Sequence, residues 1–134
     1  MKSVHAGCVL ASVALLVGCT EVTYQVKIIN NGSFTTDFAI ESNDSTTTFV
    51  QDLAPGKSTT VSHTATTFVT GTDRVTVSSG TLIGNEITPI DAQCTAAATS
   101  NDLLTVVKAL DGTLSCTVTE ARQAGSDKPA RKGK

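Results

Sequence analysis

The chain has 134 residues, 10 of them basic and 12 acidic, which gives a formal net charge of −2 at pH 7. This length suits a single domain, and a hydrophobic fraction of 40% beside a charged fraction of 16% argues against disorder throughout. The charge balance disfavours a dedicated nucleic-acid binder, and an aromatic fraction of 4% without Trp disfavours a stacking platform for sugars or bases.

The first element in the chain is an apolar run close to the N-terminus. Residues 8–17 read CVLASVALLV and follow a short segment that carries the charge of Lys2. This pattern is typical of a secretory signal peptide. As a helix the run would extend about 15 Å, roughly half of the hydrocarbon thickness of a bilayer, so it does not predict a permanent membrane span.

The apolar run ends in Leu16-Val17-Gly18-Cys19, which resembles the lipobox of bacterial lipoprotein precursors. The resemblance implies a signal peptide at residues 1–18, cleavage after Gly18, a diacylglycerol thioether on the Cys19 sulfur and acylation of the new amino terminus. Thr20 follows Cys19 where inner-membrane members carry Asp, so in a Gram-negative source the resemblance favours the outer membrane. The alternative is an ordinary signal peptide cut nearby, with Cys19 incidental.

The remaining cysteines predict one disulfide. Cys8 would leave with the signal peptide and Cys19 would carry lipid, which leaves Cys94 and Cys116 as a pair. Export places this pair in an oxidising compartment, where a disulfide is the default. A redox or metal-binding role would need CxxC-like spacing or further ligands, and the chain offers neither.

The first half of the body reads as short strands with polar turns between them. Alternating or β-branched runs predict strands at residues 22–29, 34–42, 46–53 and 58–64. The turns are expected at residues 30–33, 43–45 and 54–57. The Asn31-Gly32 step between two such runs predicts a β-hairpin.

The second half continues the pattern less regularly. A further strand is expected to start at Phe68 and Val69, then one at residues 74–78 that ends at Gly80, then a weak one at residues 81–90. Residues 91–102 contain three successive alanines and suit one helical turn. Residues 101–110 fit a helix as well as a strand, and we prefer a strand at 103–110 because a DG turn leads into a last strand at 114–119.

Seven or eight strands at about ten-residue spacing predict an all-β fold, a single immunoglobulin-like β-sandwich over residues 19–120, with a small β-barrel as the alternative. The segments VKIINNGS, FAIES and LAPGKSTTVS between Val26 and Ser62 resemble CARDB-like and related immunoglobulin-like modules of bacterial surface proteins. This resemblance covers about 35 residues, favours the sandwich and implies no function.

Charge divides the chain into an acidic domain and a basic tail. Residues 19–120 hold four basic and eleven acidic side chains, a net of −7. Residues 121–134 lack core-forming residues, predict a disordered tail and carry a net of +4. The tail could contact anionic lipid, cell-wall polymer or lipopolysaccharide, or stay solvated, or fold back on the acidic domain. Its basic residues are Arg122, Lys128, Arg131, Lys132 and Lys134.

Few residues suggest catalysis or metal binding. His63 lies among Ser and Thr in STTVSHT, and we interpret it as an exposed or hydrogen-bonded structural residue, because a hydrolase would need a pocket that joins it to Ser and Asp. Asp37 with Glu41, or Asp44 with Asp52, could converge on calcium, but no DxDxDG-like loop occurs. We therefore predict no catalytic residue, no metal and no cofactor. The aromatic residues are expected in the core, or alternatively along a ligand groove: Tyr24, Phe34, Phe38, Phe49 and Phe68.

These observations predict a lipid-anchored protein of the bacterial envelope that acts as a non-enzymatic structural or accessory binding module. The expected partners are the membrane, through acyl chains on Cys19, and an unidentified envelope protein. The alternative is an inhibitor or exclusion factor that blocks a cationic enzyme or receptor through the acidic domain.

Overall fold

Eight β-strands account for the regular structure of this chain. The computed structural model describes residues 19–68 and 71–120, and these ranges contain no α-helix, hence none that could cross a membrane. The strands are β1 (Cys19–Asn30), β2 (Thr36–Ser42), β3 (Thr47–Leu53), β4 (Ser58–Phe68), β5 (Asp73–Ile83), β6 (Glu86–Ala98), β7 (Leu103–Lys108) and β8 (Leu114–Thr119).

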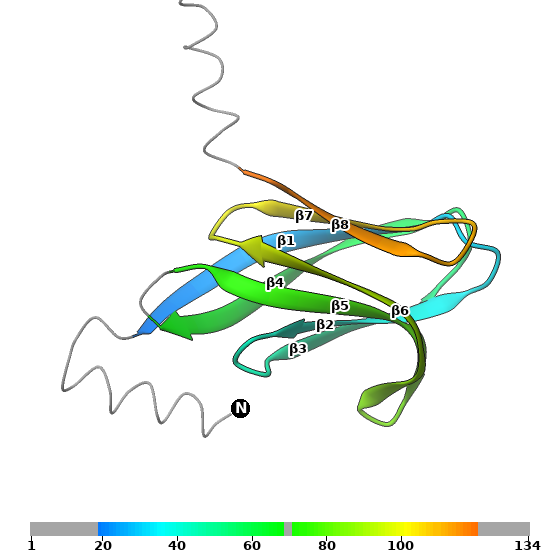
Figure 1. The fold of residues 1–134 in the computed structure, drawn as a ribbon, viewed down its shortest axis with the longest axis horizontal. Coiled ribbons are helices and arrows are strands. Elements are labelled where there is room, and N and C mark those ends of the chain that lie inside the picture. Colours follow the sequence, from blue (N-terminus) through cyan, green and yellow to red (C-terminus); the bar gives the residue numbers. More distant parts are fainter. Residues whose placement is uncertain (1–18, 69–70, 121–134) are drawn as a thin grey trace, which may run out of the picture.

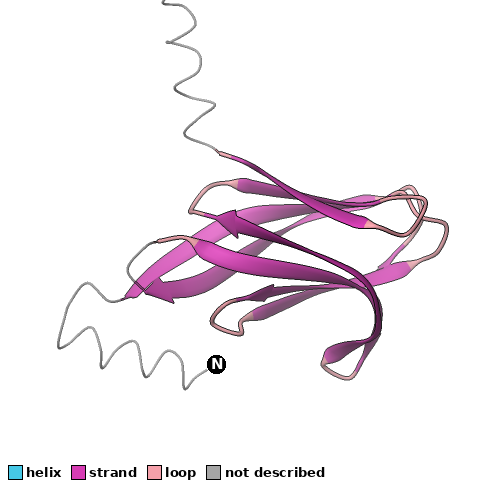
Figure 2. Cartoon of the chain, in the orientation of Figure 1, coloured by secondary structure: helices cyan, strands magenta, loops and turns pink. Residues whose placement is uncertain are grey.

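The strands form two four-stranded sheets packed face to face (Figures 1 and 2). One sheet has the order β4-β1-β7-β8 and the other has the order β3-β2-β5-β6. Within the described residues the sheets do not close on each other, so the predicted β-sandwich is confirmed and the alternative of a β-barrel is wrong.

The strand order follows that of an immunoglobulin-like sandwich in one sheet and departs from it in the other. The sheet β3-β2-β5-β6 follows the order C′-C-F-G of immunoglobulin domains, and β1 pairs with β4 as strand B pairs with strand E. An immunoglobulin domain places its first strand beside strand B, whereas here β7 lies there, parallel to β1. β7, which comes late in this chain, therefore occupies the position that the first strand occupies in immunoglobulin domains.

Strand alternation fills the space between the sheets. Every second residue of β1 from Val22 to Ile28 is buried, and the intervening side chains point outward. Burial of these side chains removes apolar area from water, which provides the main driving force for the sandwich. The largest apolar residues of the core are Val22, Tyr24, Val26, Ile28, Phe38, Ile40, Val75, Val77, Leu104 and Val106.

The Asn31-Gly32 segment does not form the predicted hairpin. It joins β1 to β2, which lie in different sheets, so the chain crosses the sandwich there. The cause is the fully buried side chain of Asn30, whose Nδ2 donates to the carbonyl oxygens of Phe34 at 2.9 Å and Leu53 at 2.8 Å. These bonds direct the loop toward the opposite sheet and outweigh the local turn preference.

Several other predictions for the second half were wrong. Residues 91–98 form no helical turn but belong to β6, which pairs with β5 from Asp73↔Ala98 to Ile83↔Glu86. β5 continues through Gly80 with a shift of register, and Gly84-Asn85 is the turn of the β5–β6 hairpin. Pairing with a neighbouring strand overrides the weak local preference of alanine for helix. Phe68 ends β4 and starts no strand, and Val69 lies outside the described residues.

Two predictions for the last strands are confirmed. β7 is a strand and not a helix, and β8 spans the expected residues 114–119. The DG turn between them connects an antiparallel pair, from Lys108↔Leu114 to Leu103↔Thr119.

The outer half of the β5–β6 hairpin curls away from the sheet (lower right in Figure 1). A Cβ built on Gly80 would overlap the carbonyl oxygen of Pro89 and lie 2.7 Å from Cγ2 of Ile87, so the two strands approach closely only because this residue is glycine. Ile87 is buried on the outer face of its own sheet, where it lines a small concavity with Ala39 and Phe49.

The strand directions define two ends of the sandwich. β1 begins at the Cys19 end, and β8 runs toward that end but stops level with Gln25, midway along β1, since Thr119 pairs with Leu103 and Leu103 pairs with Gln25. At the far end lie the β1–β2 loop, the β3–β4 turn and the β7–β8 turn. β1 has 12 residues, so the two ends are about 35 Å apart.

Candidate functional site

A groove with a volume of about 600 Å³ opens at the far end of the sandwich. The β1–β2 loop and the β7–β8 turn form one side, and β5 with β6 forms the other. This volume suits a small-molecule site. The groove is lined by charged, hydroxyl and apolar side chains, among them those of Phe34, Thr81, Asp91, Lys108, Leu110 and Asp111.

Lys108 provides a buried positive charge in this groove. It is the last residue of β7 and follows the inward-facing Leu104 and Val106, so its stem continues the core and only 7% of the residue is exposed. Its Nζ donates to Ser79 Oγ of the opposite sheet at 3.0 Å and lies 3.5 Å from Asp91 Oδ2. An ammonium has three N–H donors. The contacts with Ser79 and Asp91 use two of them, so one remains for an acceptor on a ligand.

Phe34 is the most exposed large apolar residue of the described chain, at 79%. Its carbonyl oxygen accepts hydrogen bonds from Asn30 Nδ2 and Thr36 Oγ1, each at 2.9 Å. Gly32 N also donates to Asn30 Oδ1 at 2.9 Å. The loop is therefore held by several bonds while it presents the ring to solvent. The predicted core position of Phe34 was wrong; the residue lines the groove instead, and the role of that groove as a ligand site stays a prediction.

Leu110 is presented in the same way by the β7–β8 turn, with 74% of it exposed. The Asp111 carboxylate accepts hydrogen bonds from Thr113 N at 3.0 Å and Thr113 Oγ1 at 2.7 Å, and the bond from the backbone lowers the Asp111 pKa. Asn31 N donates to the Lys108 carbonyl oxygen at 2.8 Å and ties this turn to the β1–β2 loop. Hydrogen bonds thus hold both the β1–β2 loop and the β7–β8 turn on this side of the groove.

A second polar cluster lies inside the sandwich near the Cys19 end. Asp73 Oδ2 accepts hydrogen bonds from Tyr24 Oη and Ser42 Oγ, each at 2.6 Å. Ser42 Oγ also lies 2.6 Å from His63 Nε2, and Thr48 Oγ1 lies 2.8 Å from His63 Nδ1. Asp73 Oδ1 is buried with no hydrogen-bond partner among the described residues.

This cluster brings together Ser, His and Asp, but not in the order of a catalytic triad. A triad needs a His that accepts the serine proton and a carboxylate that orients the His. Here Ser42 donates its single proton to Asp73, so His63 Nε2 must carry a proton and donate to Ser42. A concavity of about 220 Å³ touches Ser42 but neither His63 nor Asp73. The arrangement is that of a structural network, and His63 is hydrogen-bonded as expected.

Burial changes the titration of this cluster. Burial lowers the pKa of His63, and the negative charges of Asp73 and Asp44 oppose the shift. Burial together with the bond to Asp73 raises the pKa of Tyr24. Both groups are therefore neutral near pH 7.

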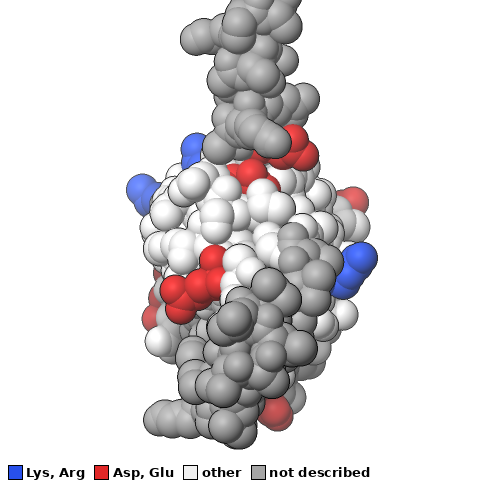
Figure 3. All heavy atoms as spheres, turned by 90° about the vertical axis from the view of Figure 1, so that its left-hand side faces the viewer, with Lys and Arg blue, Asp and Glu red and all other residues white. Residues whose placement is uncertain are grey.

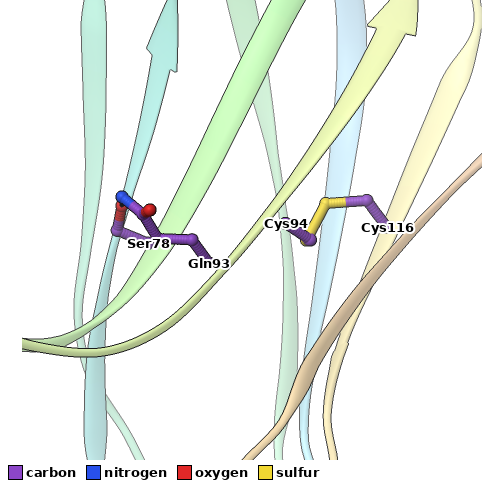
Figure 4. The surroundings of a disulfide bond; sticks show 4 residues. All are labelled: Ser78, Gln93, Cys94 and Cys116. Atoms are coloured by element: carbon purple, nitrogen blue, oxygen red, sulfur yellow. Dashed lines mark hydrogen bonds between the residues drawn. A yellow bond between two sulfur atoms is a disulfide. The ribbon is translucent and has the colours of Figure 1, made fainter.

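Cys94 of β6 and Cys116 of β8 form the predicted disulfide (Figure 4). Their Cα atoms are 5.7 Å apart, within the usual range. The bond joins the edge strands of the two sheets, and both cysteines pack against the core. Beside it, Gln93 Nε2 donates to Ser78 Oγ at 2.9 Å on the outer face of the sheet (Figure 4).

Two of the four acidic residues considered for calcium, Asp37 and Asp44, instead accept bonds from the backbone. Asp37 accepts from Asp52 N and Leu82 N, each at 2.7 Å. Asp44 accepts from Thr66 N at 2.8 Å and Thr46 N at 2.9 Å, and although burial alone would raise its pKa, these bonds lower it. Glu41 is exposed on β2. Across residues 19–68 and 71–120 no cluster of three or more ligand side chains could hold a metal ion.

The Cys19 end carries the one remaining predicted site residue that lies within the described residues, Cys19 itself. Cys19 is the first residue of β1, and Glu120 follows the end of β8. Figure 3 views this end, where acidic side chains are exposed beside a few basic ones. Glu21 and Glu41 contribute exposed carboxylates there. Residues 1–18 and the tail residues 121–134 lie outside the described residues.

Comparison with known proteins gives no functional relative. No protein-family model matches the chain, and no curated protein matches it. Two solved chains match. One is an NMR structure of a protein from Eubacterium rectale, with 13% identity, a TM-score of 0.39, and coverage of 74% of this chain and 90% of that one.

The groove was not predicted from sequence. Lys108 follows an apolar run and resembles any charge at a strand end, and Phe34 resembles any core aromatic residue. The one available signal was the polar loop N-N-G-S immediately before Phe34, which is a poor context for a core residue.

Proposed function

We propose that this protein is a non-enzymatic binding module that is lipid-anchored to the bacterial envelope through Cys19 and presents the far-end groove away from the membrane. The lipobox residues 16–18 directly precede Cys19. Cys19 in turn is the first residue of β1, so the acyl chains would be joined to the sandwich without an intervening linker.

The position of the groove is the observation that carries this proposal. It lies at the opposite end of β1 from Cys19, about 35 Å away. A lipid on Cys19 would hold one end at the bilayer and point the groove toward the envelope space. Tethering raises the effective concentration of such a module near partners in the same compartment.

The buried polar cluster supports a role without catalysis. Ser42 is nine-tenths or more buried and donates its proton to Asp73, and His63 is inaccessible. The groove holds charged and apolar groups but no histidine, serine–base pair or cysteine that could act as a nucleophile within the described residues. Its composition suits recognition.

The tail would add a second contact with the membrane. β8 runs toward the Cys19 end and stops level with Gln25, six residues along β1 from Cys19, so the tail would begin about 20 Å from the proposed lipid surface, a distance that the 14 residues 121–134 can span. Their net charge of +4 complements anionic headgroups. In a Gram-negative source, Thr20 favours the outer membrane.

Intact mass of protein purified from membranes tests the anchor. We expect a mass equal to residues 19–134 plus diacylglycerol and a third acyl chain, since stable anchoring needs more than one chain. Cys19→Ser should abolish the lipid mass and leave the chain uncleaved or released. Cys8→Ser is the matched control, because it changes a cysteine of the signal peptide and should leave lipidation intact.

Two outcomes would contradict the anchor. One is a parent protein that retains Met1 or carries no lipid. The other is normal lipid modification in the Cys19→Ser variant.

A further inference from the structure

We infer that the far-end groove binds a neutral saccharide. The inference deepens the proposed function, on which it rests for the orientation of the groove toward envelope glycans. The groups that carry it are the buried ammonium of Lys108, the carboxylates of Asp91 and Asp111, and the exposed side chains of Phe34 and Leu110.

The charge of the groove selects an uncharged ligand. Lys108 contributes one positive charge, and Asp91 and Asp111 contribute two negative charges, on a domain whose net charge is −7. The Lys108 ammonium is paired with the Asp91 carboxylate, and the Asp111 carboxylate accepts two hydrogen bonds from Thr113, so each of these charges already has a partner. A neutral ligand binds without disturbing this pairing, whereas a charged ligand would compete with it.

The hydrogen-bonding groups select a ligand rich in hydroxyls. Lys108 Nζ is a donor only, the two ionised carboxylates are acceptors only, and the hydroxyls of Thr81 and Thr35 are both. A sugar hydroxyl both donates and accepts, so adjacent hydroxyls on one ring can bridge an ammonium and a carboxylate. Lys108 Nζ and Asp91 Oδ2 are 3.5 Å apart, close enough to bind two neighbouring hydroxyls after small adjustment.

Although the chain has few aromatic residues and no Trp, the two exposed apolar side chains supply a surface for the C–H face of one sugar ring. Phe34 and Leu110 are 79% and 74% exposed on loops that several hydrogen bonds hold in place. Such fixed presentation lowers the entropic cost of binding. A volume of about 600 Å³ accommodates an oligosaccharide of a few units.

The test is a titration of the full chain, in the form that the mass measurement identifies, with maltotriose, mannotriose and the trimer of N-acetylglucosamine, followed by amide NMR shifts. We expect saturable shifts with at least one trimer, confined to residues 32–36, 80–81, 91–92 and 108–113. Because the ligand is neutral, its affinity should not change between low ionic strength and about 0.15 M salt.

Two variants separate the groove from general effects. Phe34→Ala should weaken binding about tenfold or more and leave the melting temperature unchanged, since the ring is exposed. Ile83→Ala is the matched control, because Ile83 is 61% exposed but does not line the groove, and its affinity should stay within about twofold of the parent.

The inference is overturned if none of the trimers shifts the groove amides, if the affinity falls steeply with salt, or if a peptide or anionic polymer displaces the sugar from these residues. These three results would leave the proposed lipid on Cys19 untouched. Conversely, a protein that carries no lipid but still binds a trimer would contradict the anchor and not the saccharide site.

Discussion

At the scale of single residues, the protonation state of His63 follows from the bonds around it. Ser42 has one proton and donates it to Asp73, so the proton between Ser42 and His63 belongs to Nε2. The hydroxyl of Thr48 then donates to Nδ1. A neutral His63 ring can make both of these hydrogen bonds. A protonated ring would carry a second N–H, on Nδ1, which would face the hydroxyl proton of Thr48.

This arrangement predicts a loss of stability in mild acid. The pKa of His63 is lowered in the folded state, so the unfolded chain takes up the proton first, below about pH 6.5. The free energy of unfolding should therefore fall between about pH 7.5 and about pH 5.5, by at most about 1.4 kcal/mol per pH unit. Urea unfolding at both pH values measures the effect.

The control is the variant His63→Gln, which removes the titrating ring. It should be less stable than the parent at high pH but lose less stability on acidification. Asp44 has a lowered pKa as well, yet its contribution is lost only near or below its ordinary value of 3.8, outside this window. Equal slopes for parent and variant would contradict the assignment.

At the scale of elements, the disulfide is the covalent link between the edge strands β6 and β8. Cys94 and Cys116 are 22 residues apart, and closing a loop of this size stabilises by about 3 kcal/mol in the chain-entropy model. We expect the double variant Cys94→Ala/Cys116→Ala to lose about this much free energy of unfolding, measured in urea.

A thiol-labelling experiment provides the control. In the parent protein Cys94 and Cys116 should resist alkylation until a reductant is added. An unchanged urea midpoint in the double variant, or alkylation of the parent without reductant, would show that the bond does not stabilise the sandwich.

The elements also show where local patterns sufficed. β8 and the strand core of β7 were predicted within two residues, because alternation and a DG turn are local signals. The same reasoning failed at Asn31-Gly32, because the buried amide of Asn30 binds Leu53, a residue 23 positions away. A short stretch of sequence around the turn does not include Leu53.

At the scale of the whole molecule, β8 runs toward the Cys19 end and stops level with Gln25 of β1, about 20 Å from Cys19 and within the reach of the 14 tail residues. We therefore expect the basic tail to lie against anionic lipid in the anchored protein. Each basic residue near such a surface contributes about 1 kcal/mol at moderate ionic strength. In vesicles that contain phosphatidylglycerol, trypsin should cleave after Arg122 and Arg131 more slowly than in pure phosphatidylcholine.

Salt and an internal site control this experiment. High salt should remove the difference between the two vesicles, since it screens the headgroups. Cleavage after Lys57, which is exposed in the far-end turn between β3 and β4, should be the same in both. Equal cleavage of the tail in both vesicles would instead indicate a solvated tail, or one that folds back on the acidic domain.

The sequence by itself determined the all-β class, most strand positions, the pairing of Cys94 with Cys116 and the division into an acidic domain and a basic tail. These properties depend on alternation, turn chemistry, cysteine count and charge, all of which can be read within short windows or by counting.

Only the tertiary structure decided which strands pair, how Ser42, His63 and Asp73 meet inside the sandwich, and that a groove joins Phe34, Lys108 and Asp91. These residues come from distant parts of the chain, and their contacts arise when two sheets pack face to face. The exposure of Phe34 shows the reason most clearly. Its chemistry suits a core, and only the crossing of the β1–β2 loop between the sheets leaves its ring in solvent.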